Sequence, residues 1–379
     1  LHPRVRRQRQ MCIRDRIKNL VDPSVLDSTA MVPDTLRTTL FKTERPNVIF
    51  VILESFSSRL MTTLGGEPDV AVQMDSLAKE GILFTNFYAN SFRTDRGLVA
   101  ILSGYPAQPT TSIMKYPRKT QNLPAIAGSL RDAGYRTKYY YGGDADFTNM
   151  RSYLMSSGFE NIISDQDFPV SERLSKWGAH DHLVFNRLLE DMKAEAADTA
   201  SAENARPFFQ VLQTSSSHEP FEVPYRRLAN DRLNAFAYTD SCVGDFVKRF
   251  RELPQWKNTV LVLVPDHLGA YPEHLNNLSV DRYQIPLLLI GGPVSEPRRI
   301  DIYGSQHDIA ATLLAQLSLP HQDFVFSKDM LNPASPHFAF FAVPDAFGMV
   351  TPDNQLIFNC EANAVAVDEG STKGCLLYT

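Results

Sequence analysis

Five short apolar runs constrain the fold of this chain more than any other feature. They are NVIFVILE (47–54), TKYYYG (137–142), PFFQVLQT (207–214), TVLVLVPD (259–266) and IPLLLIGG (285–292). Each run is nearly continuous, which is typical of strands that are buried on both faces of a mostly parallel sheet.

Segments with helical periodicity lie between these runs, at about 70–80, 95–103, 123–134, 181–196, 231–252 and 306–317. Strands and helices therefore alternate along the chain. This order predicts an α/β fold, a three-layer α/β/α sandwich with a mostly parallel central sheet. With 43% hydrophobic and 10% aromatic residues, the chain can bury a core of that size.

Both ends of the chain carry short segments of a different origin. One DNA sequence of the sequencing-adapter type, read on its two strands, encodes MCIRDR at 11–16 and CLLYT at 375–379. We interpret residues 1–16 and 374–379 as adapter-derived and assign them no part in the fold. Residues 1–16 hold six arginines and one aspartate, so the formal net charge without them changes from −5 to −10. Such an acidic chain lacks the clustered cations of a nucleic-acid binder.

The pattern of apolar and polar residues divides the rest of the chain into three segments. Residues 17–44 are interpreted as a linker, and residues 45–335 contain the alternating strands and helices of the main domain. Residues 336–373 change character, because short apolar segments there are separated by PD and PDN turns. This pattern predicts a small antiparallel β appendage.

Polar side chains directly follow several of the predicted strands. Glu54 ends the first run, Asp266 and His267 follow TVLVLVP, and His218 follows the run at 207–214. In open α/β sheets, ligands bind outside the carboxyl ends of the strands. Together with the hydroxyl of Thr94, these side chains offer oxygen and nitrogen ligands suited to Mn or Zn. Each also has an ordinary structural interpretation, because strand-end Asp residues cap turns and histidines brace loops.

Seven motifs occur in a fixed order: NVIFVILES, SFRTDRGLVAILSGYP, KWGAHDHLVF, SSSHEPFEVP, VPDHLGAYPEHL, IPLLLIGG and SQHDIAATLL. In content and order they resemble the lipoteichoic acid synthase-like branch, the phosphoglycerol transferases, of the sulfatase and alkaline phosphatase superfamily. The resemblance covers about residues 45–320 and implies that residues 45–335 form a catalytic domain.

The resemblance also implies roles for individual residues. Glu54, Thr94, Asp266 and His267 match the family's metal site, and Thr94 matches its nucleophile. Trp177 and His218 fall where family members bind a phosphoglycerol head group. The structural alternatives are an aromatic core residue for Trp177 and a loop-bracing histidine for His218. The resemblance implies one divalent metal ion, with Mn expected and Zn or Mg as alternatives.

Thr94 stands where a helix is predicted to begin. We expect it to be the helix cap, with its hydroxyl near the free N–H groups of the helix end, which bind phosphoryl groups well. A threonine hydroxyl is a weak nucleophile, and coordination to a divalent cation lowers its pKa. Arg96 is a further candidate for pairing with a phosphate oxygen, and its structural alternative is a solvated arginine of the first helical turn.

The reaction implied by the resemblance has two steps. Thr94 attacks a phosphoglycerol lipid and forms a phosphothreonine, with His218 as general acid or base. A glycan or polyol-phosphate acceptor, or water, then takes the group. The first acceptor class describes a transferase, and water describes a phosphodiesterase, phosphonate-ester hydrolase or sulfatase-family hydrolase. A binding domain without catalytic activity is a further alternative, which the intact set of site residues disfavours.

Departures from related families narrow these expectations. Formylglycine sulfatases carry C/S-x-P-x-R at the nucleophile, whereas this chain has TDRGL, which disfavours a sulfate ester substrate. His274 and His307 are the candidates for a second metal site. Because His307 lies in the helical pattern of SQHDIAATLL, we expect it to be structural and we expect a single metal.

The expected location is the bacterial cell membrane, with the catalytic domain on the periplasmic or extracellular face. Proteins of this branch are typically membrane proteins, and their lipid donor lies in the bilayer. No apolar run in this chain approaches the ~20 residues of a membrane span. We therefore expect membrane-spanning segments to be encoded upstream of residue 17.

Overall fold

The computed structural model describes residues 38–198, 200–269 and 271–371. The segments interpreted as adapter-derived, 1–16 and 374–379, lie outside these residues, as does most of the linker at 17–44. The end of that linker packs on the main domain, because Leu40 is fully buried and its N–H donates to Oε1 of Gln316 (2.7 Å).

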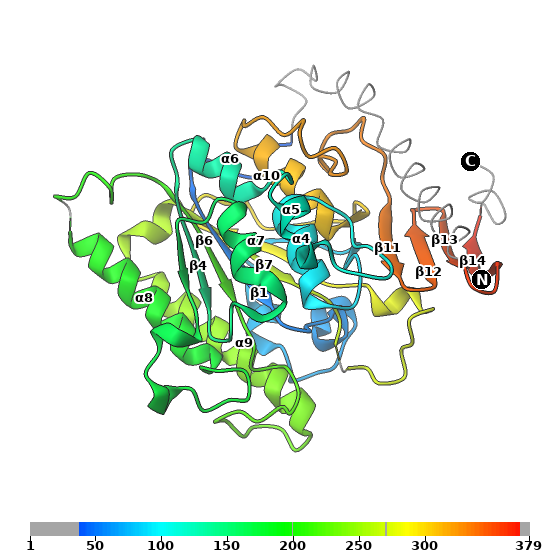
Figure 1. Cartoon of the computed structure of the whole chain (residues 1–379), viewed down its shortest axis with the longest axis horizontal. Coiled ribbons are helices and arrows are strands. Elements are labelled where there is room, and N and C mark those ends of the chain that lie inside the picture. The colour runs from blue at the N-terminus through cyan, green and yellow to red at the C-terminus, as the bar shows by residue number, and fades with distance from the viewer. Residues whose placement is uncertain (1–37, 199, 270, 372–379) are drawn as a thin grey trace.

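An eight-stranded sheet forms the centre of the molecule (Figure 1). Its strands, in spatial order, are β5 (Asn161–Ile163), β4 (Arg136–Tyr141), β6 (Phe208–Gln213), β1 (Asn47–Leu53), β7 (Thr259–Pro265), β8 (Leu287–Gly291), β2 (Ile82–Phe84) and β9 (Arg298–Ile300). Only β8 among these eight strands runs antiparallel to its neighbours. The predicted mostly parallel sheet is therefore confirmed.

Side chains of β1 alternate between the two faces of the sheet, as the pleat of a strand requires. Those of Val48, Phe50 and Ile52 join one buried cluster, and those of Ile49, Val51 and Leu53 join the other. Burying each such side chain contributes roughly 1.5–3 kcal/mol. Residues 48–53 are all apolar and fully buried, and helices cover both faces of the sheet, which explains the continuous apolar run in the sequence.

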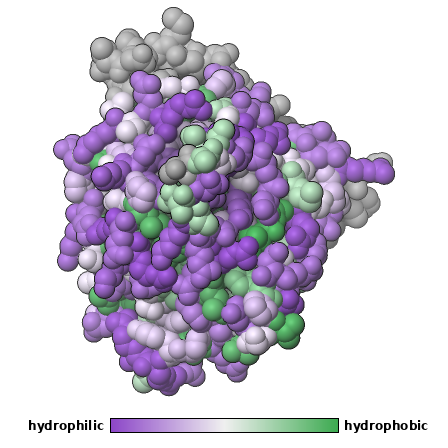
Figure 2. Space-filling model, turned by 90° about the vertical axis from the view of Figure 1, so that its left-hand side faces the viewer, coloured by the Kyte–Doolittle hydropathy of each residue, from purple (hydrophilic) through white to green (hydrophobic). Residues whose placement is uncertain are grey.

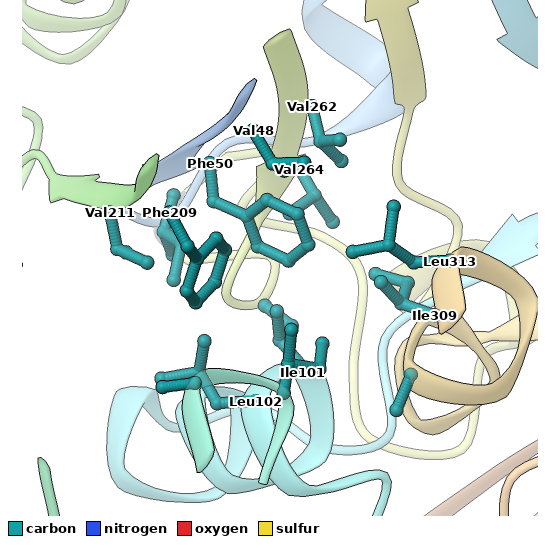
Figure 3. Packing of buried hydrophobic residues seen from close by; sticks show 14 of the residues in the cluster. Val48, Phe50, Ile101, Leu102, Phe209, Val211, Val262, Val264, Ile309 and Leu313 are labelled. Carbon is teal, nitrogen blue, oxygen red and sulfur yellow. The ribbon is translucent and has the colours of Figure 1, made fainter. Parts of the chain in front are cut away.

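Helices cover each face of the sheet and complete the expected sandwich (Figure 1). The first layer contains α4 (Thr94–Ser103), α6 (Ile126–Asp132), α7 (Met150–Ser156) and α10 (Ile309–Gln316). The second contains α3 (Val72–Leu77), α8 (Asp181–Ala197) and α9 (Asp231–Phe250). Figure 3 shows the first layer's contact, where Ile101 and Leu102 of α4 face Phe50 and Phe209 of the sheet.

A separate antiparallel sheet follows the main domain, as the turn pattern predicted. It consists of β11 (Ala339–Val343), β12 (Ala346–Val350), β13 (Asn354–Asn359) and β14 (Ala364–Gly370). Its first strand contacts the main domain closely. The ring of Phe341 stacks on Tyr283 with centroids 3.7 Å apart, and the N–H of Ala342 donates to the carbonyl of Asn90 (2.9 Å).

The face of the molecule on the α8 side is mainly hydrophilic, with hydrophobic residues in small separate areas (Figure 2). Within residues 38–198, 200–269 and 271–371, none of the helices combines the length and apolar character that a membrane span requires.

Candidate active site

The carboxyl ends of two neighbouring strands bring three polar side chains together. Glu54 directly follows β1, and Asp266 and His267 directly follow β7. The two strands are parallel and adjacent, with Leu53 paired to Pro265. The strand register therefore places all three residues at one point of the sheet edge. One ligand atom from each lies within 4.8 Å of the others.

Thr94 completes this cluster from the first residue of α4. Its Oγ1 lies 3.3 Å from Oε2 of Glu54 and 3.3 Å from Nε2 of His267. Nε2 of His267 in turn lies 3.5 Å from Oδ2 of Asp266 and 3.7 Å from Oε1 of Glu54. Two carboxylates, an imidazole and a hydroxyl thus converge on one small volume.

Asp266 is held by one of its two carboxylate oxygens. Oδ1 accepts hydrogen bonds from the N–H groups of Ser55 (2.9 Å) and His267 (2.8 Å). Oδ2 is buried and has no hydrogen-bond partner among the residues that the structure describes. Burial, with a further contribution from Glu54, raises the pKa of Asp266 to about 7. A buried carboxylate oxygen without a partner is costly unless something positive faces it.

His267 presents one ring nitrogen to the cluster and uses the other for orientation. Nδ1 lies 3.0 Å from the carbonyl oxygen of Leu268. A carbonyl only accepts, so Nδ1 carries the proton and Nε2 keeps a free lone pair. Burial lowers the pKa of His267, but the charges of Asp266 and Glu54 outweigh it, and the net shift is upward.

The donor set fits a divalent cation. Carboxylate and imidazole ligands suit Mn and Zn, and the unpartnered Oδ2 of Asp266 is the kind of group that a cation would neutralise. The hydrogen bond from Nδ1 of His267 to a backbone carbonyl matches the support that metal-bound histidines usually receive. Glu54, Thr94, Asp266 and His267 would hold the ion.

The expectation that Thr94 caps its helix is wrong. The N-cap of α4 is Arg93, which makes no side-chain capping bond, and Thr94 is the first helical residue. The hydroxyl of Thr94 points instead toward Glu54 and His267. The sequence pattern located the helix start to within one residue, whereas the direction of the hydroxyl depends on the sheet edge beside it.

The aromatic rings of His218 and Trp177 form a pair. Their ring centroids are 4.2 Å apart, and Nε1 of Trp177 donates to the carbonyl of Glu219 (2.6 Å). The residue before it, Ser217, donates its hydroxyl to the carbonyl of Glu54 (2.7 Å), which places the loop that carries His218 at the same sheet edge. Burial lowers the pKa of His218, so its ring is mainly neutral near pH 7.

Arg96 occupies a more interior position than a solvated first-turn arginine. Its side chain is buried, donates to Oγ of Ser91 (3.2 Å) and lies over the ring of Phe92. Burial lowers the pKa of Arg96. Its Nε has no partner among the described residues, so part of its hydrogen-bonding capacity is free.

Asp181 supports the loop that carries His218, and it was missed in the sequence interpretation. It is fully buried, and its Oδ1 accepts from the N–H groups of Ser215 (2.8 Å) and Ser216 (3.1 Å). Its Oδ2 accepts from the hydroxyl of Thr239 (2.7 Å). The sequence shows an acidic residue four positions after Trp177 in KWGAHDHLVF. It does not reveal the hydrogen-bond partners of that residue, which lie far away in the sequence.

The two histidines considered for a second metal site lie elsewhere. His274 is exposed, and His307 is fully buried against the side chain of Asn90, with Nδ1 2.8 Å from Nδ2. Among the described residues, Glu54, Asp266 and His267 form the group of His, Cys, Asp and Glu side chains close enough to hold an ion.

A family model described as Sulfatase matches residues 46–319, which is most of the chain. The chain belongs to the sulfatase family. Its fold agrees with this membership. A protein of the alkaline phosphatase superfamily from Vibrio parahaemolyticus superposes with a TM-score of 0.77 at 25% identity, covering 93% of this chain and 90% of that one. The lipoteichoic acid synthase LtaP from Listeria monocytogenes superposes with a TM-score of 0.74 at 20% identity, covering 93% and 92%.

Curated relatives of this sulfatase-family chain include phosphoglycerol transferases. Phosphoglycerol transferase I of Xanthomonas campestris pv. campestris (strain B100) is 26% identical, over 80% of this chain and 45% of that protein. The lipoteichoic acid synthase-like protein YvgJ of Bacillus subtilis is 22% identical, over 76% of this chain and 50% of that protein. The chain thus spans about half the length of the curated relatives it matches.

Proposed function

We propose that this chain is the catalytic part of a metal-dependent phosphoglycerol transferase that works through a phosphothreonine intermediate. One observation carries the proposal: Oγ1 of Thr94, at the start of α4, lies 3.3 Å from both Glu54 and His267. The hydroxyl of Thr94 thus lies among buried side chains of the kinds that bind metal ions. The names of the relatives, phosphoglycerol transferase and lipoteichoic acid synthase-like protein, support the substrate class.

A divalent cation held by Glu54, Asp266 and His267 would supply the positive charge that lowers the pKa of the Thr94 hydroxyl. We expect Mn, with Zn or Mg as alternatives. The N-terminal end of α4 contributes a partial positive charge in the same place, which favours a bound phosphoryl group.

In the first step, Oγ1 of Thr94 forms a bond to phosphorus, and the bond between phosphorus and the oxygen of the lipid alcohol breaks. The products are a free lipid alcohol and a phosphoglycerol group on Thr94. The lipid alcohol oxygen needs a proton as it leaves. The proton of the Thr94 hydroxyl passes to solvent. We assign the delivery of a proton to the leaving oxygen to His218: its ring, which is mainly neutral near pH 7, takes up a proton from solvent and passes it to the lipid alcohol oxygen as the bond breaks.

In the second step, a hydroxyl of the acceptor forms a bond to phosphorus and the bond to Oγ1 of Thr94 breaks. The acceptor hydroxyl gives up its proton to the ring of His218, and Oγ1 of Thr94 regains a proton from solvent. We propose a glycan or polyol-phosphate acceptor of the cell envelope, and a location at the bacterial cell membrane with this domain on the periplasmic or extracellular face. His218 and Trp177 would contact the phosphoglycerol head group, and Arg96 would approach a phosphate oxygen.

Mass spectrometry of the protein after digestion tests the proposal. The protein is incubated with phosphatidylglycerol and Mn²⁺, digested, and searched for a phosphoglycerol adduct on the peptide that contains Thr94. We expect the adduct in the wild type and its absence in Thr94→Ala. Thr94→Ser keeps an oxygen at the same place and should retain part of the labelling.

The products separate the two acceptor classes. Phosphoglycerol transferred to an added glycan or polyol phosphate supports the transferase, whereas free glycerol phosphate formed without any acceptor product indicates a hydrolase. Full turnover by Thr94→Ala would rule out covalent catalysis through this residue.

A further inference from the structure

Gln306 lies outside the set of residues considered above, yet its side chain joins the two halves of the site. It is the first residue of η10 (Gln306–Asp308), which precedes α10, and it is fully buried. A fully buried glutamine is uncommon, because its amide needs several hydrogen-bond partners in the interior.

The amide of Gln306 makes three hydrogen bonds, all of them to backbone groups. Its Nε2 donates to the carbonyl oxygens of Pro265 (2.8 Å) and Asp266 (2.7 Å). Its Oε1 accepts from the N–H of Asn90 (2.9 Å). Because carbonyls can only accept and an N–H can only donate, these partners fix the orientation of the amide.

The three partners belong to the two segments that build the site. Pro265 and Asp266 end β7 and lead into His267, whereas Asn90 lies four residues before Thr94. The peptide between Asp266 and His267 carries one of the accepting carbonyls. The hydrogen bonds of Gln306 therefore set the distance between the metal ligands of β7 and the loop that leads to the nucleophile.

Gln306 is itself held in a rigid frame. Ser305 and Asp308 form a reciprocal capping box around η10, and Asp308 also pairs with the buried Lys328 (2.5 Å). The N–H of Phe340 in β11 donates to Oγ of Ser305 (2.7 Å). Because η10 is held in place, the hydrogen bonds of Gln306 can hold the end of β7 and the loop at Asn90 in fixed positions.

We propose that Gln306 is a positioning residue that keeps Asp266 and His267 in the arrangement a divalent cation requires, an inference that rests on the proposed metal-dependent function. Without Gln306, the peptide after Asp266 loses its hydrogen bond to the helical segment at 306–316. The backbone that carries both ligands is then less constrained, although their local hydrogen bonds remain. Supporting groups of this kind typically change metal affinity or activity by about 10- to 100-fold.

Gln316 provides a matched control on the same helical segment. It is also a glutamine that bridges two backbone groups, because its Oε1 accepts from the N–H of Leu40 (2.7 Å) and its Nε2 donates to the carbonyl of Thr38 (2.9 Å). These partners belong to the segment before β1 and not to the site. Gln306→Met and Gln316→Met each keep the side-chain length and remove the amide.

The experiment measures the Kd for Mn²⁺ by electron paramagnetic resonance of the free ion, together with thermal unfolding with and without Mn²⁺. We expect Gln306→Met to raise the Kd by about 10- to 100-fold and to reduce the rise in Tm that Mn²⁺ produces. Gln316→Met should keep the wild-type Kd. Both variants are expected to lose some Tm in the absence of metal, because both leave buried backbone groups unpaired.

Equal Kd values for Gln306→Met and the wild type would overturn the positioning role while leaving the proposed function intact. If the wild type binds none of Mn²⁺, Zn²⁺ and Mg²⁺, both the inference and the proposed function are overturned; if it binds Zn²⁺ or Mg²⁺ instead of Mn²⁺, the same comparison of Kd values is made with that ion. If Gln306→Met does not fold, Gln306→Glu is measured instead, because it keeps the acceptor for Asn90 and replaces the donor nitrogen with a carboxylate oxygen that faces the two carbonyls. An unchanged Kd in that variant overturns the inference equally.

Discussion

The backbone of Gly97 in α4 lies directly against the carbonyl group of Asp266. A Cβ atom added at Gly97 would overlap with the carbonyl oxygen and crowd the carbonyl carbon of Asp266. The helix that carries Thr94 therefore touches the strand end that carries two of the candidate metal ligands, without any side chain between them. This contact and the hydrogen bonds of Gln306 hold the same two segments together.

Gly97→Ala should separate these segments. Because the obstructing atoms are backbone, relief requires a shift of α4 or of the end of β7, and overpacking of this kind costs roughly 1–3 kcal/mol. We expect a lower free energy of unfolding in urea, weaker Mn²⁺ binding and a loss of turnover.

Gly128→Ala is the control for this substitution. Gly128 also lies within a helix, and a Cβ atom there would meet only the carbonyl oxygen of Ser157 at 3.4 Å. This change should be neutral or stabilising by up to ~1 kcal/mol, because alanine favours helices. Wild-type metal binding by Gly97→Ala would show that the contact has no role in positioning the ligands.

Trp177→Phe tests the head-group assignment. Phenylalanine keeps an aromatic ring beside His218 and loses the hydrogen bond to Glu219. A substitution that weakens the binding of the substrate and of the transition state equally raises KM and leaves kcat unchanged. A hydrogen bond of about 1 kcal/mol corresponds to a rise in KM of roughly fivefold.

Trp177→Ala removes the ring contact with His218 as well, and it should lower kcat in addition to raising KM. The other tryptophan of the chain, Trp256, packs on Phe250 and Arg251 in the second layer. Trp256→Phe should leave both kinetic constants unchanged. Equal kinetics for Trp177→Ala and the wild type would contradict a role for Trp177 in substrate binding.

Lys328 supplies a buried ammonium group below the C-terminal sheet. Its Nζ donates to Oδ2 of Asp308 (2.5 Å) and to the carbonyl of Phe338 (2.9 Å), and the side chain is almost fully buried. Lys328→Met leaves the carboxylate of Asp308 buried without its partner. Breaking a buried pair in this way costs about 3–5 kcal/mol, which urea unfolding would measure.

The exposed pair of Arg131 and Asp132 gives the comparison for Lys328. Arg131→Met should change the free energy of unfolding by less than about 1 kcal/mol. A loss of similar size in both variants would mean that water reaches Lys328. The double variant Lys328→Met with Asp308→Asn should recover part of the loss, because it removes the unpaired charge.

The sequence allowed the principal strands to be predicted because each contains a short run of mainly apolar or aromatic residues. The run at 285–292 corresponds to β8, but its antiparallel direction depends on how the chain returns to the sheet, which an apolar run does not reveal. The short strands β2, β5 and β9 were missed, since three residues each are too few for periodicity. Pairing with longer neighbours makes them strands.

The metal-type ligands were predictable from their positions directly after strands. The groups that hold those ligands were not. Gln306 and Asn90 are 216 residues apart in the sequence and meet only in the folded chain. Asp181 likewise reaches Ser215 from 34 residues away. Polar contacts in the interior leave no periodic signal, so the structure was needed to find them.

His307 gives a prediction for the dependence of stability on pH. Burial lowers the pKa of His307 to about 4, with Asp308 raising it and Lys328 lowering it further. The ordinary pKa of a histidine is about 6.5. Below that pH, the unfolded chain binds a proton at this residue while the folded chain keeps it neutral down to about pH 4. The contribution of His307 to stability is therefore present above pH 6.5 and is lost as the pH falls toward 4, by at most about 3 kcal/mol.

His307→Gln should remove this loss. Urea unfolding at intervals from pH 7 to pH 4 would measure the free energy of unfolding for both proteins, and the difference between them isolates His307 from the other groups that titrate in this range. We expect the wild type to lose stability relative to the variant as the pH falls. His321→Gln, a change in the loop after α10, should keep the wild-type profile. Parallel curves for the wild type and His307→Gln would show that His307 takes up its proton in the folded state as readily as in the unfolded chain.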